Sequence, residues 1–288
     1  MSKLFPGEGL LKDACKHDHH NKASWLIKHG VDPECGRTDV MRRTKDESPL
    51  IKASKSGAQR VIETLLKSKV ELKQVDWHHD RNALHWACKR GHYGTCIYLV
   101  KLGMNQCSLD REKITPLMFA AWWGHTKITK FLLSGPSSKQ INRHSEKHGW
   151  NALIGAVHHC QLECIKLLLA SGADPNELDA YGRPALLHSS DARVAKLLLD
   201  AGAVCEMTAR GKNILHLASE RDDPATVEVV IENIMLKRKD PKILQSMVYE
   251  LDGVTGRSPI AIAKVKGHKK VLTVLRSTCF HVYSTLSH

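Results

Sequence analysis

The sequence of 288 residues is poor in aromatic side chains and has no long apolar run. Phe, Trp and Tyr together make up only 5% of it, so a core must be built mainly from Leu, Ile, Val and Ala. No apolar stretch approaches the roughly eighteen residues of a membrane-spanning helix, and the opening residues do not resemble a signal peptide. Hydrophobic residues still form 42% of the chain, which excludes wholesale disorder. We therefore predict a folded protein of the cytosol or the nucleus, without a membrane partner.

The nine cysteines form no CxxC pair and no compact framework. An odd number at irregular spacings is typical of free thiols in a reducing compartment. The segment CKHDHH, from Cys15 to His20, contains thiolate and imidazole groups that suit zinc. Its residues also fit the positions of a repeat described below, so we predict neither a metal site nor a cofactor.

Acidic residues are in deficit, because 30 Asp and Glu face 43 Lys and Arg, which gives a formal net charge of +13. This charge permits an acidic protein, a nucleic acid or an anionic membrane as a partner. The local motifs of common enzymes, such as GxxxxGK[ST], HExxH, GxSxG and GxGxxG, are also missing. We therefore predict a protein that is not an enzyme.

The chain instead contains a repeated pattern. Similar segments begin at Ser48, Asn82, Thr115, Asn151, Asn213 and Ser258. A shortened copy starts at Pro184, and a copy without its opening motif starts near Leu10. The first spacings are close to 33 residues, as in stacked helical repeats. One copy is too small to bury its own Leu-rich stripe, so neighbouring copies must stack.

The six full copies carry a start signal for a first helix, and four of them carry a glycine stop signal. Ser, Asn or Thr opens the copy and can cap the free backbone N–H groups. Proline follows at positions 49, 116 and 259, where its fixed φ suits a first helical turn. Gly57, Gly91, Gly124 and Gly267 can adopt the left-handed conformation that ends the helix. The L-L-L run then forms the buried stripe of a second helix.

This pattern resembles the ankyrin repeat family, with its T-P-L-H-x-A-A-x-x-G-H motif, its L-L-L run and the following G-A-D-P-N. GHTKITKFLL and KLLLASGADPNELDAYG are close matches, and the resemblance covers roughly residues 10–276. It implies an all-α solenoid of stacked helix-turn-helix units with β-hairpin connections, in a single curved array. It also implies a protein-protein interaction module, an adaptor or scaffold that is commonly monomeric.

The array is predicted over residues 1–276, with a C-terminal tail at 277–288. Its units lie near 10–32, 48–80, 82–113, 115–149, 151–182, 184–211, 213–256 and 258–276. The 184–211 unit lacks about three residues, so we expect short or offset helices there. An insert at 232–257 should form an extra helix from Asp240–Pro241, with Ile243, Leu244, Met247, Val248 and Leu251 on one face. Residues 33–47 should form a long polar loop.

Five of the 18 histidines occupy positions that the repeat prescribes. His85 and His216 take the T-P-L-H position, where the family's histidine bonds within the turn and to the next repeat. His92, His125 and His268 take the G-H position. Five histidines lie at positions that the fold does not prescribe and need solvent or a partner; these are His78, His79, His148, His158 and His159.

In ankyrin arrays the concave face, formed by hairpin tips and the exposed side of the first helix, carries most partner contacts. Trp122 and Trp123 occupy the two variable positions before G-H, although one of them could pack under the neighbouring repeat. Trp25 is expected to pack within the terminal repeat. The candidate partner-binding residues are Trp122, Trp123, Trp86, Lys89, Arg90, His78, His79, Arg81, Glu112, His148, Trp150, His158, His159, Tyr181, Arg183, Arg210 and Lys212, with Lys55 and Arg221 at equivalent helix positions.

Three functions remain open from the sequence. The first is binding of another protein that has acidic or aromatic anchors, since Trp, Tyr and Arg often dominate binding energy. The second is binding of nucleic acid or polyphosphate through the same aromatic and basic face. The third is substrate recognition in a cullin ubiquitin ligase, as in relatives that append a SOCS box. The twelve residues after Arg276 do not resemble that box.

Overall fold

The computed structural model describes residues 6–35, 47–238 and 240–286. The chain divides into two compact units, Met1–Glu146 and Lys147–His288. In the described residues, β pairing is limited to isolated antiparallel bridges, Val75–Asn82, Leu178–Pro184 and Ala209–Lys212, at the turns between repeats. The prediction of an all-α repeat fold is confirmed.

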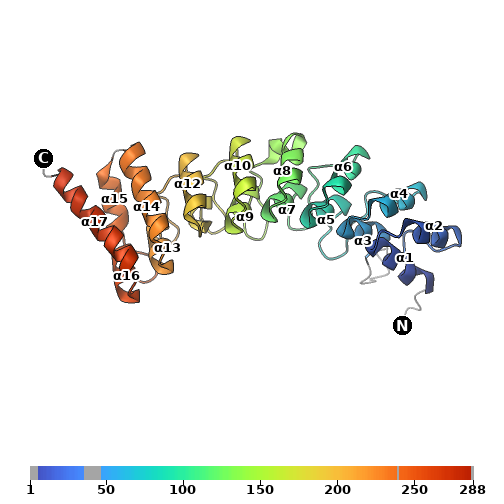
Figure 1. Ribbon diagram of the computed structural model, residues 1–288, viewed down its shortest axis with the longest axis horizontal. Coiled ribbons are helices and arrows are strands. Elements are labelled where there is room, and N and C mark those ends of the chain that lie inside the picture. Colours follow the sequence, from blue (N-terminus) through green and yellow to red (C-terminus); the bar gives the residue numbers. More distant parts are fainter. Residues whose placement is uncertain (1–5, 36–46, 239, 287–288) are drawn as a thin grey trace. The chain divides into compact units, whose positions relative to one another are not determined.

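In its described residues, the first unit contains four helix pairs. Its elements are α1 (Pro6–Lys16), α2 (His20–Lys28), α3 (Pro49–Ser56), α4 (Gln59–Lys67), α5 (Ala83–Arg90), α6 (Tyr93–Lys101), α7 (Pro116–Trp122), α8 (Thr126–Leu133) and the 3-10 helix η1 (Pro136–Gln140). The first helices pack in succession, α1 on α3, α3 on α5 and α5 on α7, and the second helices follow the same order (Figure 1). The core consists of the small and aliphatic residues between these two rows.

The second unit continues the same pattern with one extra helix. Its elements are α9 (Ala152–His158), α10 (Leu162–Ala170), α11 (Ala185–His188), α12 (Ala192–Asp200), α13 (Ile214–Arg221), α14 (Pro224–Glu232), the π-helical η2 (Asn233–Arg238), α15 (Pro241–Tyr249), α16 (Pro259–Lys266) and α17 (Lys269–Leu286). Here α11 packs between α9 and α13, and α13 packs on α16. None of the helices in the described part of the chain is long and apolar enough to cross a membrane.

The predicted capping residues perform that role in the structure. The side chains of Ser48, Asn82, Thr115, Asn151, Asn213 and Ser258 each accept a hydrogen bond from a backbone N–H of the first helical turn. His85 and His216 extend this cap, because each Nδ1 accepts the N–H of the capping asparagine. The opposite ring nitrogen, Nε2, donates to carbonyl oxygens of the next turn, Ile114 O at 3.1 Å from His85 and Glu250 O at 3.1 Å from His216.

The turn glycines make room for a bond between repeats. Gly57 and Gly91 have φ values of 74° and 82°, and a Cβ at Gly57 would lie 2.5 Å from the ring of His92. That ring donates from Nε2 to Lys55 O at 2.9 Å, and His125 donates to Lys89 O in the same way at 3.1 Å. A side chain at either glycine would therefore strain the backbone and displace the histidine.

We expect Asn82→Ala to lower the free energy of unfolding by about 1 kcal/mol, because it removes a helix cap. The Asn82 side chain accepts the His85 N–H at 3.1 Å and donates to Ser108 Oγ at 2.9 Å. Urea denaturation of the full chain measures the change. Asn82→Ser retains a capping oxygen and should restore most of the loss, whereas equal losses in both variants would contradict the capping role.

The predicted departures from the repeat are mostly confirmed. Helix α11 has only four residues, as expected for the shortened copy. Helix α15 is the predicted extra helix, and it buries Leu244, Met247 and Val248. The inclusion of Leu251 on that face is wrong, because α15 ends at Tyr249 and leaves Leu251 exposed.

The terminal regions differ from the predictions in two ways. Helix α17 continues to Leu286, so most of the predicted tail, residues 277–286, is helical. The expected packing of Trp25 is wrong, since this side chain is 58% exposed and stacks on His29 at the end of α2. Residues 36–46 of the predicted loop lie outside the described residues.

Candidate functional site

The two adjacent tryptophans differ in exposure at the end of α7. Trp123 is 53% exposed and lies at the C-terminal end of the helix. Trp122 is partly buried, and its ring meets the ring of Phe119 edge-on at 6.1 Å between centroids. Trp123 is thus the more accessible anchor of the pair.

Cations gather over the aromatic rings of this first unit. Lys55 Nζ lies 3.6 Å from the centroid of the Trp86 ring. Lys89 Nζ lies 5.1 Å from the Trp86 ring, 5.6 Å from the Phe119 ring and 5.8 Å from the Trp123 ring. These distances are within the range of cation–π attraction. We call Lys55, Trp86, Lys89, Phe119 and Trp123 the cation–aromatic cluster.

Of the two cations in the cluster, Lys89 has no paired carboxylate among the described residues. Lys55 pairs with Glu47, but the ammonium of Lys89 forms no ion pair with any residue that the structure describes. Burial lowers the pKa of Lys89 below its usual value, and the nearby charges of Arg81, Arg90 and Lys55 lower it further. An anion arriving beside Lys89 would relieve this repulsion.

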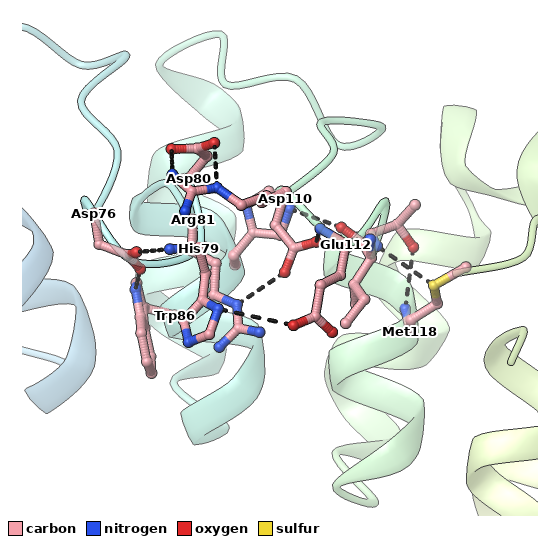
Figure 2. A network of polar contacts seen from close by, with 12 residues as sticks. Asp76, His79, Asp80, Arg81, Trp86, Asp110, Glu112 and Met118 are labelled. Atoms are coloured by element: carbon pink, nitrogen blue, oxygen red, sulfur yellow. Dashed lines mark hydrogen bonds and ion pairs between the residues drawn. The ribbon is translucent and has the colours of Figure 1, made fainter. Parts of the chain in front are cut away.

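The prediction that Trp86 and Arg81 lie on the binding surface is wrong. Trp86 is 8% exposed, and its indole N–H donates to Asp76 Oδ2 at 2.7 Å. Arg81 is also buried and donates from Nε to Asp110 Oδ2 at 2.9 Å (Figure 2). Both residues lie beneath the surface, and their polar groups already donate hydrogen bonds within the chain.

The hairpin tips of the first unit carry the predicted polar residues. His78 is exposed, and its ring lies 3.3 Å from the Trp77 ring centroid. His79 Nδ1 lies 3.9 Å from Glu112 Oε1 (Figure 2). Burial and the charge of Arg81 lower the pKa of His79 despite the neighbouring carboxylates. The ring is therefore mostly neutral at pH 7 and can donate or accept a hydrogen bond.

In the second unit, the aromatic candidates form a separate group. The Trp150 ring lies 4.7 Å from the ring of His158 and 5.5 Å from that of His188. His148 lies between Trp150 and Tyr181, at 5.9 Å and 6.4 Å. Sequence reasoning missed His188, which occupies the fifth position of its repeat, as Trp86 does in its own.

His188 is a buried, neutral member of this group. Its Nε2 donates to Asp179 Oδ2 at 3.0 Å, and the same carboxylate accepts a hydrogen bond from Arg183 Nε at 2.9 Å. Burial, followed by the charge of Arg183, lowers the pKa of His188 to about 4. Burial also lowers the pKa of His158, helped by His159. These imidazoles therefore add aromatic surface without adding charge at neutral pH.

A groove of about 760 Å³ collects several candidates of the second unit. The predicted residues that line it are His148, Trp150, Tyr181, Arg183, Arg210 and Lys212, and the sequence reasoning missed Leu187, Ala209, Leu217 and Val254. His158 and His159 are exposed at the end of α9 but do not line the groove. The four missed residues are small or aliphatic side chains, which carry no signal that separates a groove wall from a core.

These surfaces present cations, neutral imidazoles and aromatic faces. Such groups attract anions and bury flat apolar surfaces. In the CKHDHH segment, Cys15 is fully buried and Asp18 adopts the left-handed turn conformation with φ of 53°. No group of three or more His, Cys, Asp and Glu side chains in the described ranges is arranged to hold a metal ion.

Known proteins share the sequence pattern along much of the chain. Human transient receptor potential cation channel subfamily A member 1 is 25% identical over 238 residues, which are 69% of this chain and 21% of that protein. Inversin of Canis lupus familiaris is 33% identical over 215 residues, which are 75% of this chain and 16% of inversin. The chain thus spans only a small part of the length of these relatives.

A solved structure and a family model agree on the fold. The human ASB11 ankyrin repeat domain superposes with a TM-score of 0.66 at 22% identity, covering 76% of this chain and 96% of that chain. A family model described as "Ankyrin repeats (3 copies)" matches residues 70–144, 109–179 and 153–240. Because these matches span more than half of the sequence, and the stacked helix pairs reproduce the solved fold, the chain belongs to the ankyrin repeat family.

Proposed function

We propose that this chain is an adaptor or scaffold that binds a partner protein through the cation–aromatic cluster and the neighbouring hairpin tips. Ankyrin repeats are in general protein-protein interaction modules and typically not enzymes, although some proteins that contain them also carry enzyme domains. The observation that supports the proposal is Lys89, a half-buried cation without a carboxylate, beside the exposed ring of Trp123. We place the interaction in the cytosol or the nucleus, on the sequence grounds given above.

The chemistry of the cluster favours a partner with an acidic side chain next to an aromatic or aliphatic one. A carboxylate would pair with Lys89, and the apolar side chain would cover the indole of Trp123. Buried aromatic anchors with polar surroundings dominate the energy of many interfaces. The underlying rings of Trp86 and Phe119 are held by the fold, so little side-chain freedom is lost on binding.

The test is affinity capture from nuclease-treated lysate, comparing the parent chain with Trp123→Ala and Lys89→Glu. We expect specific proteins to be captured by the parent and lost with either variant. Once a partner is identified, Trp123→Ala should weaken the affinity of the chain for that partner by about thirtyfold, as for an interface hot spot. Trp25→Ala is the matched control, because Trp25 is equally exposed but belongs to α2.

Two results would refute the proposal. If nuclease abolishes capture and the affinity falls steeply with salt, the surface binds nucleic acid instead. If Trp25→Ala removes the same proteins as Trp123→Ala, these proteins bind any exposed indole, and the cation–aromatic cluster is not a specific site. Thermal unfolding of each variant checks that the fold is retained.

A further inference from the structure

The groove of the second unit lies beside first helices that differ in size at one repeat position. Counted from the capping residue, the fifth position holds Trp86 in α5 and Phe119 in α7, and both rings are buried. The same position holds Gly155 in α9, the buried ring of His188 in α11 and Leu217 in α13. Of these three residues of the second unit, Leu217 lines the groove.

The shape of the groove suits an extended chain segment. Its lining residues come from four successive turns and helix starts, represented by Trp150, Tyr181, Arg210 and Val254. Leu187 is 6% exposed and forms an apolar floor, whereas Tyr181 and Val254 are exposed at the rim. A floor of this kind accepts one aliphatic or aromatic side chain, while the neighbouring residues of the segment follow the row of turns.

The charges of the groove favour an acidic segment. Its lining includes Arg183, Arg210 and Lys212 but no carboxylate. Asp179 binds Arg183 and Glu220 binds Lys212, so those two cations are already paired. The Arg210 side chain forms no hydrogen bond or ion pair with the described residues. A carboxylate that enters the groove therefore meets one uncompensated guanidinium.

The backbone holds Arg210 in place for this role. Ala209 and Lys212 exchange two N–H···O bonds of 3.0 Å around the turn, and the N–H of Gly253 donates to Arg210 O at 2.9 Å. Arg210 itself has φ of 54°, a left-handed conformation that is uncommon for a residue with a Cβ. The turn thus fixes the backbone from which the Arg210 side chain extends, which reduces the backbone entropy lost on binding.

We propose that this groove is a second binding site, which takes a linear acidic peptide segment of a partner by seating one large apolar side chain on Leu187 and pairing an adjacent carboxylate with Arg210. The site lies within Lys147–His288 and needs no residue of the cation–aromatic cluster. It adds a separate contact to the function proposed above and stands without it.

A displayed library of random peptides, selected against the full chain, tests the specificity of the groove. We expect enrichment of peptides with Asp or Glu within a few residues of Leu, Phe or Trp. A synthetic copy of an enriched peptide should lose binding when its acids are replaced by Lys. Enrichment of basic peptides, or binding that survives the change to Lys, would overturn the proposal.

Fluorotryptophan labelling of the full chain locates the bound peptide. Trp150 is the only tryptophan of Lys147–His288, and Trp150→Phe identifies its fluorine signal. We expect the enriched peptide to shift the Trp150 signal and to leave the Trp123 signal unchanged. A shift at Trp123 alone would place the peptide on the cation–aromatic cluster and reject the groove, without touching the function proposed for that cluster.

Charge reversal at the turn then tests the role of Arg210. Arg210→Glu should weaken binding of the enriched peptide by at least about tenfold, because it replaces attraction by repulsion. Arg276→Glu, an exposed arginine of α17 outside the groove, should change it by less than about twofold. Equal effects of the two variants, or displacement of the peptide by an oligothymidine strand, would show nonspecific anion binding and overturn the proposal.

Discussion

Asp110→Ala should lower the free energy of unfolding by about 3–5 kcal/mol, because it leaves the charge of Arg81 buried without a partner. The Asp110 side chain is fully buried and accepts three hydrogen bonds, from Arg81 Nε at 2.9 Å, the Glu112 N–H at 2.9 Å and the Ile114 N–H at 2.8 Å. This single carboxylate therefore joins two consecutive turns. Urea denaturation followed by circular dichroism measures the loss.

One of the exposed ion pairs of the same unit provides the control for Asp110. Lys113 and Glu146 lie 3.3 Å apart, and both side chains are more than half exposed. Glu146→Ala should change the stability by less than about 1 kcal/mol, since exposed pairs contribute little. A loss below 1 kcal/mol for Asp110→Ala as well would mean that water reaches Arg81, and the buried pair would have no special role.

Mild acid should destabilise the protein between about pH 6.5 and pH 4, through His85 and His188. Burial lowers the pKa of each imidazole to about 4 in the folded chain. In the unfolded chain these groups take up protons near pH 6.5, so the unfolded state binds more protons within this window. Stability is therefore intact above pH 6.5 and falls as the pH decreases, by on the order of 3 kcal/mol for each histidine.

The pH dependence of urea unfolding midpoints measures this effect. His188→Gln keeps a donor for Asp179 but cannot take up a proton, so its stability should fall less steeply toward pH 4. His78→Gln, which removes an exposed imidazole from a hairpin tip, is the control variant. If the slope of stability against pH is the same for His188→Gln and the parent, protonation of His188 does not contribute to acid unfolding.

Most of the scaffold could be predicted from the sequence because its signals are local. The capping Asn82, the turn Gly91 and the buried stripe of the second helix each determine the backbone within one turn of the chain. The shortened α11 and the inserted α15 were equally readable, since each follows from residue spacing and helix signals. Leu251 was misplaced because no local signal marked the end of α15 at Tyr249.

The candidate surface was only partly predictable, because exposure depends on neighbouring repeats. Trp86 and Arg81 occupy variable positions, yet Asp76 and Asp110 bind them and hold them beneath the surface. Trp25 matched an apolar position, but its side chain stays 58% exposed. The groove was not predicted because Leu187, Ala209, Leu217 and Val254, which complete its lining, are small or aliphatic side chains that form no motif.

The histidine bonds between repeats give the array a direction. His92 and His125 each reach back to a carbonyl of the preceding repeat, and His268 does the same at Ser219 O, at 2.8 Å. Each of these three repeats thus brings the donor for the bond that joins it to the repeat before it. The repeats that begin at Asn151, Pro184 and Asn213 have Gln161, Asp191 and Asp223 at the corresponding N-cap position, so a gain or loss of one repeat keeps this bond only where the repeat that follows carries the histidine.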